Sequence, residues 1–187
     1  MISTKSIQCG MKVIAQSMEQ SADELNTADG QLGDGDLGVS MIQGFRDILD
    51  ILDSLPEDIG MAIYECAKAL TKSSGSSFGT LMATGMMAVA KVKKGHNIIE
   101  LEEVSRLFDI ALEAMQNRGK ASPGDKTVLD VIVAARDAAK NQSEGLTLLH
   151  SINQSINDTI DRFRNHQSQV GRARIFGEKS IGLDDPG

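Results

Sequence analysis

Three aspartates separated by glycines form the most distinctive local pattern in the sequence. Asp29, Asp34 and Asp36 fall within eight residues, in the segment Asp29–Gly38, whose glycines allow the chain to turn tightly. Three carboxylates that face one point repel one another unless a cation neutralises them. Carboxylate oxygens are hard ligands that suit Mg²⁺ or Ca²⁺, and Mg²⁺ commonly joins a few carboxylates to substrate phosphates. The pattern therefore indicates metal-bridged phosphate binding.

Other interpretations of this segment compete with phosphate binding. The simplest is an acidic turn exposed to solvent. An EF-hand requires Glu at its twelfth position, and counting from Asp34 that position is Phe45, so an EF-hand is excluded. Gly33, Gly35 and Gly38 match the dinucleotide fingerprint by letter. However, an amphipathic helix rather than a strand is predicted before them, and the aspartates would repel a bare pyrophosphate.

Two neighbouring segments offer further contacts for a ligand. The helix after the acidic segment begins near Val39, with Ser40 in its first turn, and its free backbone N–H groups offer a second phosphate anchor. Residues 72–80 form a loop of small residues. This loop is either a turn with a serine helix cap or a place where the backbone approaches a ligand closely.

Two later segments also carry polar residues. Residues 119–127 nearly match a P-loop, but Asp125 intervenes between the second glycine and Lys126-Thr127, and no strand is predicted before them. A Walker A motif is therefore excluded, and Asp125 or Thr127 could instead cap the next helix. Residues 171–187 are long and irregular. Arg172 or Arg174 there could contact a phosphate or form a surface ion pair.

Helical periodicity positions these segments in the connections between helices. Apolar residues recur three or four positions apart along most of the chain, and no segment alternates long enough to predict a strand. The predicted helices cover residues 3–27, 39–53, 57–72, 78–93, 100–117, 125–141 and 145–164. Short connections favour antiparallel neighbours, so alternate loops should meet at one end. We expect an all-α antiparallel bundle that forms a single domain over residues 1–187.

Composition narrows the classes of partner. The net charge is −7 and aromatic residues make up only 3% of the chain. Nucleic acids and anionic membranes attract a basic face, and single-stranded nucleic acid needs aromatic stacking platforms, so neither partner is expected. No apolar stretch is long enough to span a bilayer, and the N-terminus lacks an apolar leader. We therefore expect a cytoplasmic protein.

Taken in order, four motifs resemble the nucleotide-binding L subunit of dihydroxyacetone kinases. They are Asp29-x₃-Gly-Asp34-Gly-Asp36-x-Gly38, Ser74-Gly75-x₃-Gly79, Gly119-Lys-Ala-x₂-Gly-Asp-Lys-Thr127-x-Leu-Asp130 and Gly171-Arg172-Ala-x₃-Gly-Glu-x-Ser-Ile-Gly-x₂-Asp185-Pro-Gly187. The resemblance implies an antiparallel barrel of about eight amphipathic helices with the nucleotide site in loops at one end. Since seven helices are predicted, we expect the chain to be truncated before a final helix.

The resemblance also implies roles for individual residues. Asp29, Asp34 and Asp36 are the expected ligands of two Mg²⁺ ions that bridge the phosphates of ADP or ATP. Together with Arg172, which is expected near the phosphates, they are the candidate catalytic residues. The other positions that the resemblance places against the nucleotide are Leu37, Gly38, Val39, Ser40, Ser73, Ser74, Gly119, Val128, Asp185, Pro186 and Gly187. Within this set, Gly119 and Val128 are expected to border the base.

The resemblance finally implies phosphoryl transfer with protein partners. In the family, dihydroxyacetone (glycerone) binds to a separate K subunit. A free-standing L subunit resembles the phosphotransferase-linked branch, in which a phosphohistidine on a third subunit, charged from phosphoenolpyruvate, converts the bound ADP to ATP. Exchangeable ATP is the other possible donor.

One position departs from the family's pattern. Leu37 stands where the family usually has His, and Leu cannot donate a hydrogen bond to a phosphate. Two alternatives therefore stay open. One is a kinase subunit for another small ketose, and the other is a nucleotide-binding regulatory module that docks onto a transcription regulator.

Overall fold

Helical periodicity accounts for most of the architecture. The computed structural model describes residues 1–72 and 76–186. The α-helices in this part are α1 Thr4–Leu32, α2 Leu37–Leu49, α3 Ile59–Lys72, α4 Ser77–Lys93, α5 Val104–Gly119, α6 Val128–Ala138 and α7 Gly145–Arg164. Short 3₁₀ segments lie at η1 Leu52–Ser54, η2 Leu101–Glu103 and η3 Ala173–Ser180. Each predicted helix is thus confirmed, although several helices begin or end at other residues than predicted.

Three expectations about local structure were wrong. First, α1 runs on to Leu32, so Asp29 lies on a helix and not in a loop. Second, the two-residue strands β1 Ile2–Ser3 and β2 Ile98–Ile99 pair antiparallel, and segments this short show no periodicity. Third, α6 begins at Val128, later than predicted, because Thr127 adopts extended backbone geometry and caps the helix.

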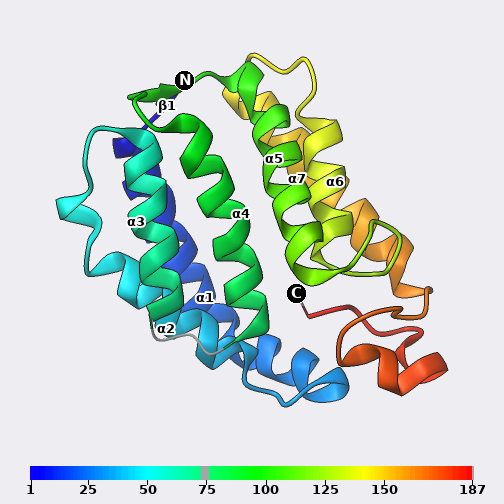
Figure 1. The fold of residues 1–187 in the computed structure, drawn as a ribbon. Coiled ribbons are helices and arrows are strands. Elements are labelled where there is room, and N and C mark those ends of the chain that lie inside the picture. The colour runs from blue at the N-terminus through cyan, green and yellow to red at the C-terminus, as the bar shows by residue number, and fades with distance from the viewer. Residues whose placement is uncertain (73–75, 187) are drawn as a thin grey trace.

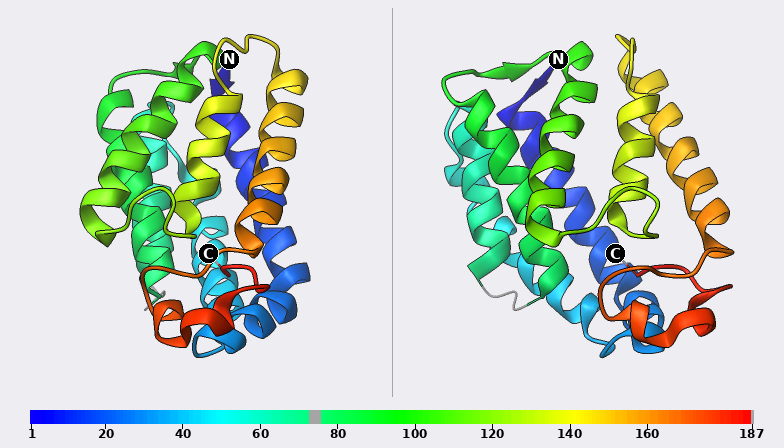
Figure 2. Two further views of the ribbon diagram at one scale, coloured as in Figure 1. Left: turned by 90° about the vertical axis from the view of Figure 1, so that its right-hand side faces the viewer. Right: turned by 45° about the vertical axis from the view of Figure 1, so that its right-hand side comes forward.

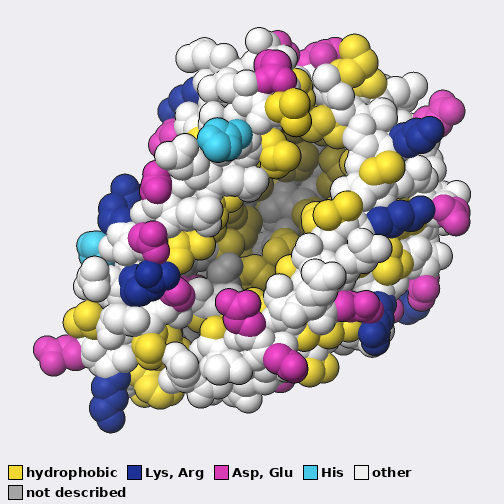
Figure 3. All heavy atoms as spheres, turned by 180° about the vertical axis from the view of Figure 1, so that it is seen from behind, with side chains coloured by type: hydrophobic (Ala, Val, Ile, Leu, Met, Phe, Trp, Pro, Cys, Tyr) yellow, Lys and Arg dark blue, Asp and Glu magenta, His cyan; other side chains and the backbone are white. Residues whose placement is uncertain are grey.

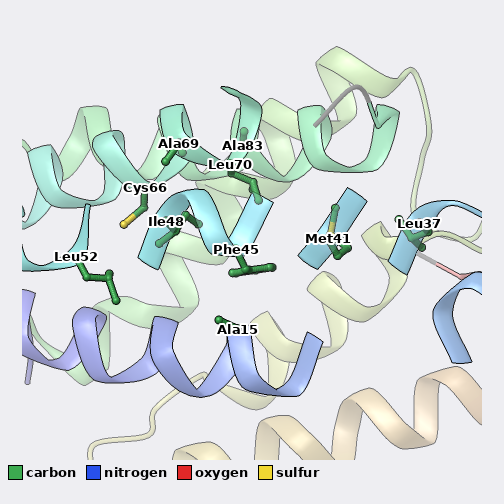
Figure 4. Packing of buried hydrophobic residues seen from close by; sticks show 11 residues of the cluster. Ala15, Leu37, Met41, Phe45, Ile48, Leu52, Cys66, Ala69, Leu70 and Ala83 are labelled. Atoms are coloured by element: carbon green, nitrogen blue, oxygen red, sulfur yellow. The ribbon is translucent and has the colours of Figure 1, made fainter. Parts of the chain in front are cut away.

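Two apolar cores hold the helices together. The larger one joins the first four helices through Ala15 of α1, Phe45 and Ile48 of α2, Leu70 of α3 and Ala83 of α4 (Figure 4). A smaller core lies between α5 and α6, where Leu112, Met115 and Leu129 are buried. Methionine and aliphatic side chains fill these cores, in keeping with the scarcity of aromatic residues.

The helices follow one another around the molecule in chain order. Each of α1 to α6 packs against the next helix in the sequence, whereas α7 has no comparable packing against α1 in the described part of the chain. Seen from behind, the surface is hollowed, and apolar side chains line the hollow (Figure 3). In the described part, no helix is both long enough and apolar enough to cross a membrane.

The predicted site loops gather at one end of the bundle. Figures 1 and 2 show the α1–α2 connection, the α5–α6 connection and the segment after α7 at the same end. The expected arrangement of loops at one end is therefore confirmed. The segment after α7 was expected to be irregular throughout, but it contains η3, which lies close to α1.

Candidate functional site

The three aspartates converge as the sequence predicted. One carboxylate oxygen from each of Asp29, Asp34 and Asp36 lies within 4.8 Å of the other two. Asp34 and Asp36 are exposed, and Asp29 is partly buried. Three hard, negatively charged oxygens at this separation fit a divalent cation such as Mg²⁺, because its charge would offset their mutual repulsion. The cluster is therefore a candidate metal centre.

Asp29 also holds the loop between α1 and α2 in shape. Its Oδ2 accepts backbone N–H groups from Gly35 at 2.9 Å, Asp36 at 3.0 Å and Leu37 at 3.3 Å. Gly35 has a φ of 78°, a left-handed conformation that glycine adopts without strain. Asp29 thus fixes the backbone that carries Asp36, and its other carboxylate oxygen remains outside these three bonds.

A cation from the far end of the chain reaches the acidic cluster. Arg172 forms an ion pair with Asp34, with 2.5 Å between Nη1 and Oδ2. This hydrogen bond lowers the pKa of the Asp34 carboxyl below its usual value of 3.8, and the same contact raises the pKa of Arg172. Both side chains are more than half exposed. Arg172, which was expected near the phosphates, thus lies beside the candidate metal ligands.

The start of α2 is arranged differently from the expectation. Asn26 Oδ1 accepts the N–H groups of Gly38 at 2.8 Å and Val39 at 3.3 Å, and the N–H of Ser40 donates to the carbonyl of Asp36 at 3.0 Å. The expectation of free N–H groups in this first turn was therefore wrong. A helix end needs acceptors for these donors, and α1 supplies them through Asn26.

Gly38 instead allows α1 and α2 to approach closely. A Cβ atom built on Gly38 would lie 2.2 Å from the carbonyl oxygen of Ala22 in α1. Val39 is 61% exposed and does not line the cavity described next. Leu37 is buried in the larger core, although it also borders that cavity.

A cavity of about 580 Å³ adjoins the acidic cluster. Its lining joins the α1–α2 connection to the start of α4 and to the segment after α7. The predicted residues on its wall are Asp29, Asp34, Asp36, Leu37, Ser40, Arg172, Asp185 and Pro186. We call this cavity the acidic compartment, because its wall holds the three candidate metal ligands.

A second cavity of about 430 Å³ continues from the first. The two share wall residues, among them Phe78, Thr127 and Gly171, so they form one groove. The second cavity is bordered mainly by small and aliphatic side chains, including Leu81 and Val128, and we call it the aliphatic compartment. The groove therefore runs from an end rich in carboxylates to an end bordered mainly by small and aliphatic side chains, with Arg118 and Asp185 also on its wall.

The structure locates most of the predicted binding residues. Gly119 and Val128, which were expected to border the base, line the aliphatic compartment, and Asp185 lines both compartments. Ser73, Ser74 and Gly187 lie outside the described residues.

Several lining residues were not predicted individually. They are Leu32, Gly33, Ser76, Ser77, Phe78, Thr80, Leu81, Arg118, Ala121, Thr127, Leu129, Val170, Gly171 and Ala173. Most of them fall inside the four sequence motifs or beside them. The motifs therefore indicated which segments line the groove. They did not indicate which residues of each segment face it.

Comparisons with known proteins place the chain in a family. A family model described as the DAK2 domain matches residues 31–187. The chain therefore belongs to the DAK2-domain family, which confirms the resemblance that the four motifs carry.

Two bacterial relatives cover most of the chain. The ADP-binding subunit DhaL of the PEP-dependent dihydroxyacetone kinase of Escherichia coli (strain K12) is 32% identical over 171 residues, which are 87% of this chain and 80% of that subunit. The ADP-binding subunit DhaL of the PTS-dependent dihydroxyacetone kinase of Lactococcus lactis (strain IL1403) is 28% identical over 173 residues, covering 92% of this chain and 84% of that subunit.

A solved structure shares the fold. The crystal structure of the dihydroxyacetone kinase from C. freundii in complex with AMP-PNP and Mg²⁺ superposes with a TM-score of 0.71 at 22% identity. The match covers 91% of this chain and 30% of that longer chain. The all-helical fold predicted from the sequence is therefore confirmed.

Proposed function

We propose that this chain holds ADP or ATP through Mg²⁺ ions on Asp29, Asp34 and Asp36, and serves as the nucleotide-binding subunit of a dihydroxyacetone kinase. The observation that carries this proposal is the groove itself. Three converging carboxylates stand at its charged end and aliphatic side chains at the other. A metal-bound polyphosphate joined to a flat, largely apolar base has this same polarity. The two relatives described as ADP-binding subunits support the proposal.

The donor set fits two Mg²⁺ ions better than a bare phosphate. Three carboxylates would repel a polyphosphate, whereas Mg²⁺ held by Asp29, Asp34 and Asp36 would offset the negative charge of the carboxylates and of the phosphates. The protein's own part is to position the groups. Asp29 fixes the loop through its backbone bonds, Asp34 and Asp36 present oxygens to the metals, and Arg172 adds a positive charge beside them.

Arg172 and Asp34 exchange partners in this proposal. In the structure the two side chains pair with each other. When the carboxylate of Asp34 binds a metal, the guanidinium of Arg172 becomes available to an oxygen of a phosphate, which it can meet with two parallel hydrogen bonds. The ion pair thus keeps both side chains at the mouth of the groove before the nucleotide enters.

The partners are proposed from the same relatives. The names of these relatives describe one kinase as PEP-dependent and the other as PTS-dependent. We propose a separate K subunit that holds dihydroxyacetone and a phosphohistidine-carrying phosphotransferase subunit that recharges the bound ADP. The chain is proposed to act as one domain, with the nucleotide at the loop end of the bundle.

A reconstituted transfer assay tests this function. The chain, a K subunit and the phosphotransferase proteins are mixed with phosphoenolpyruvate and dihydroxyacetone, and dihydroxyacetone phosphate is measured over time. The proposal expects turnover that requires the chain and is lost in Asp34→Asn, while the matched control Asp158→Asn on the exposed face of α7 retains it. Absence of turnover with a folded, nucleotide-loaded chain contradicts the kinase role.

Leu37 favours a second candidate, a nucleotide-binding regulatory module. Its aliphatic side chain has no hydrogen-bond donor to offer a phosphate, and it packs in the larger core with 7% of the residue exposed. Such a module would bind nucleotide in the same groove and dock onto a transcription regulator without transferring phosphate. The transfer assay separates the two candidates, since the module predicts bound nucleotide and no product.

A further inference from the structure

Lys126 is a buried cation that the proposed phosphate chemistry leaves unused. Its side chain is 2% exposed, and its backbone is left-handed with a φ of 61°. Its Nζ donates to the backbone carbonyls of Ser180 at 2.8 Å, His166 at 2.9 Å and Arg164 at 3.2 Å. An ammonium group has three protons, so these three bonds use its whole capacity as a donor.

The three carbonyls bracket the segment that carries Arg172. Arg164 ends α7 and His166 follows it, while Ser180 ends η3. Carbonyls at the end of a helix lack partners within the helix and carry partial negative charge, so a cation there is favourable. Lys126 thus ties both ends of residues 165–180 to the α5–α6 connection, and Arg172 lies between the two tied ends.

Further hydrogen bonds hold residues 165–180 in place, whereas few apolar side chains of this segment are buried. The buried side chains among residues 165–186 are Ser168, Ala173 and Ser180. Ser180 Oγ donates to the carbonyl of Gly177 at 2.6 Å and accepts the N–H of Ser168 at 3.0 Å. Two backbone bonds add to these, from Gln169 N–H to the carbonyl of Asp125 at 3.1 Å and from Gly182 N–H to the carbonyl of Arg164 at 2.8 Å. Since apolar burial is sparse, removal of the ammonium group removes a large share of the anchoring.

Lys126 is on the wall of neither the acidic nor the aliphatic compartment. It borders a third cavity of about 280 Å³ between α6, α7 and the C-terminal residues, which adjoins the groove through shared wall residues such as Thr127 and Asp185. With its protons already donated, it has none for a phosphate oxygen. This placement differs from that of a P-loop lysine, which contacts the phosphates directly.

We propose that Lys126 is a positioning residue of the nucleotide site, which acts by holding residues 165–180 so that Arg172 meets the acidic cluster. The inference rests on the proposed nucleotide binding. The lysine in the near-match to a P-loop at residues 119–127 thus organises the wall of the site from behind and does not contact the phosphates.

The test compares Lys126→Met with Lys120→Met in the full chain stripped of nucleotide. Lys120 is a matched control, because it lies in the same connection, is also left-handed with a φ of 54°, and is exposed. Titration with ADP in the presence of Mg²⁺ should show affinity weakened about tenfold or more in Lys126→Met, the equivalent of one lost charge-assisted hydrogen bond. Lys120→Met should keep the wild-type affinity. Limited trypsin digestion of the nucleotide-free proteins should cleave faster after Arg174 in Lys126→Met alone.

A double variant separates positioning from general stability. If Lys126 acts through Arg172, adding Arg172→Met to Lys126→Met weakens ADP binding no further. Additive losses, or wild-type affinity in a folded Lys126→Met, overturn the inference. If Lys126→Met does not fold, Lys126→Gln replaces it, because its amide keeps two N–H donors but loses the charge and the third proton; weaker ADP binding is expected, and unchanged affinity overturns the inference. Failure of the wild-type chain to bind ADP is a distinct result that overturns the proposed function itself.

Discussion

Asp29 and Asp34 should differ sharply in what their removal does to stability, although both are proposed metal ligands. Asp29→Ala removes the acceptor of three backbone N–H groups at the start of α2. Asp34→Ala removes an exposed ion pair with Arg172 and local hydrogen bonds within the acidic cluster. The two variants therefore separate the structural part of the acidic cluster from its metal-binding part.

The expected loss of stability in Asp29→Ala follows from the hydrogen bonds that Asp29 accepts. A hydrogen bond to a charged group contributes about 1.5–3 kcal/mol. The three bonds share one partly exposed oxygen, and the variant also relieves repulsion with two other carboxylates, so we expect a loss of about 2–3 kcal/mol in total. For a chain of this length each kcal/mol lowers Tm by about 2–4 °C, which predicts a fall of about 4–12 °C. Asp34→Ala should melt close to the wild type.

Thermal melts without metal and titrations with Mg²⁺ and ADP provide the assay. Both variants should lose Mg²⁺-dependent ADP binding, and only Asp29→Ala should lose stability. Equal melting temperatures for the two variants would refute the structural role given to Asp29. Retention of Mg²⁺-dependent binding by Asp34→Ala would refute the ligand set.

Three further predictions concern other parts of the molecule. In Arg172→Gln the pKa of Asp34 should rise toward 3.8, because its hydrogen bond to Arg172 lowers it, and NMR titration measures this directly. The ion pair is accordingly complete at neutral pH and is lost as the pH falls below 3.8 toward the lowered pKa. Gly38→Ala should lower Tm by several degrees in a thermal melt, since the new Cβ would meet a carbonyl of α1, and an unchanged Tm would contradict this packing. Burial raises the pKa of Cys66 to about 11, so at about pH 8 a thiol reagent should label the exposed Cys9 in the folded protein and both cysteines after denaturation.

The sequence predicted the helices well because burial alone sets their pattern. Apolar residues at helical spacing must face a core, and the seven long helices follow that rule. The ends of helices are less predictable, since they depend on partners outside the helix. α1 extends through Asp29 to Leu32, and no change in apolar spacing marks this extension.

Contacts between distant segments explain what could not be predicted about the site. Asn26 Oδ1 accepts the backbone N–H of Gly38, 12 residues later in the sequence. Lys126 Nζ donates to the carbonyl of Ser180, 54 residues later. Asn26 lies before the acidic segment, and nothing in the sequence pattern around it indicates that its side chain caps the next helix. Lys126 stood out only by its resemblance to a P-loop lysine. The acidic cluster itself was predictable because its three ligands lie close together in the chain.

Calorimetric titration of the nucleotide-stripped chain with ADP tests the central claim most directly. The titration is made with Mg²⁺ and with EDTA, and is repeated on Asp34→Asn. The account predicts ADP binding that requires Mg²⁺ and is lost in the variant. ADP binding that survives both EDTA and Asp34→Asn, or no binding by the folded wild-type chain, would contradict a nucleotide site bridged by metal on these aspartates.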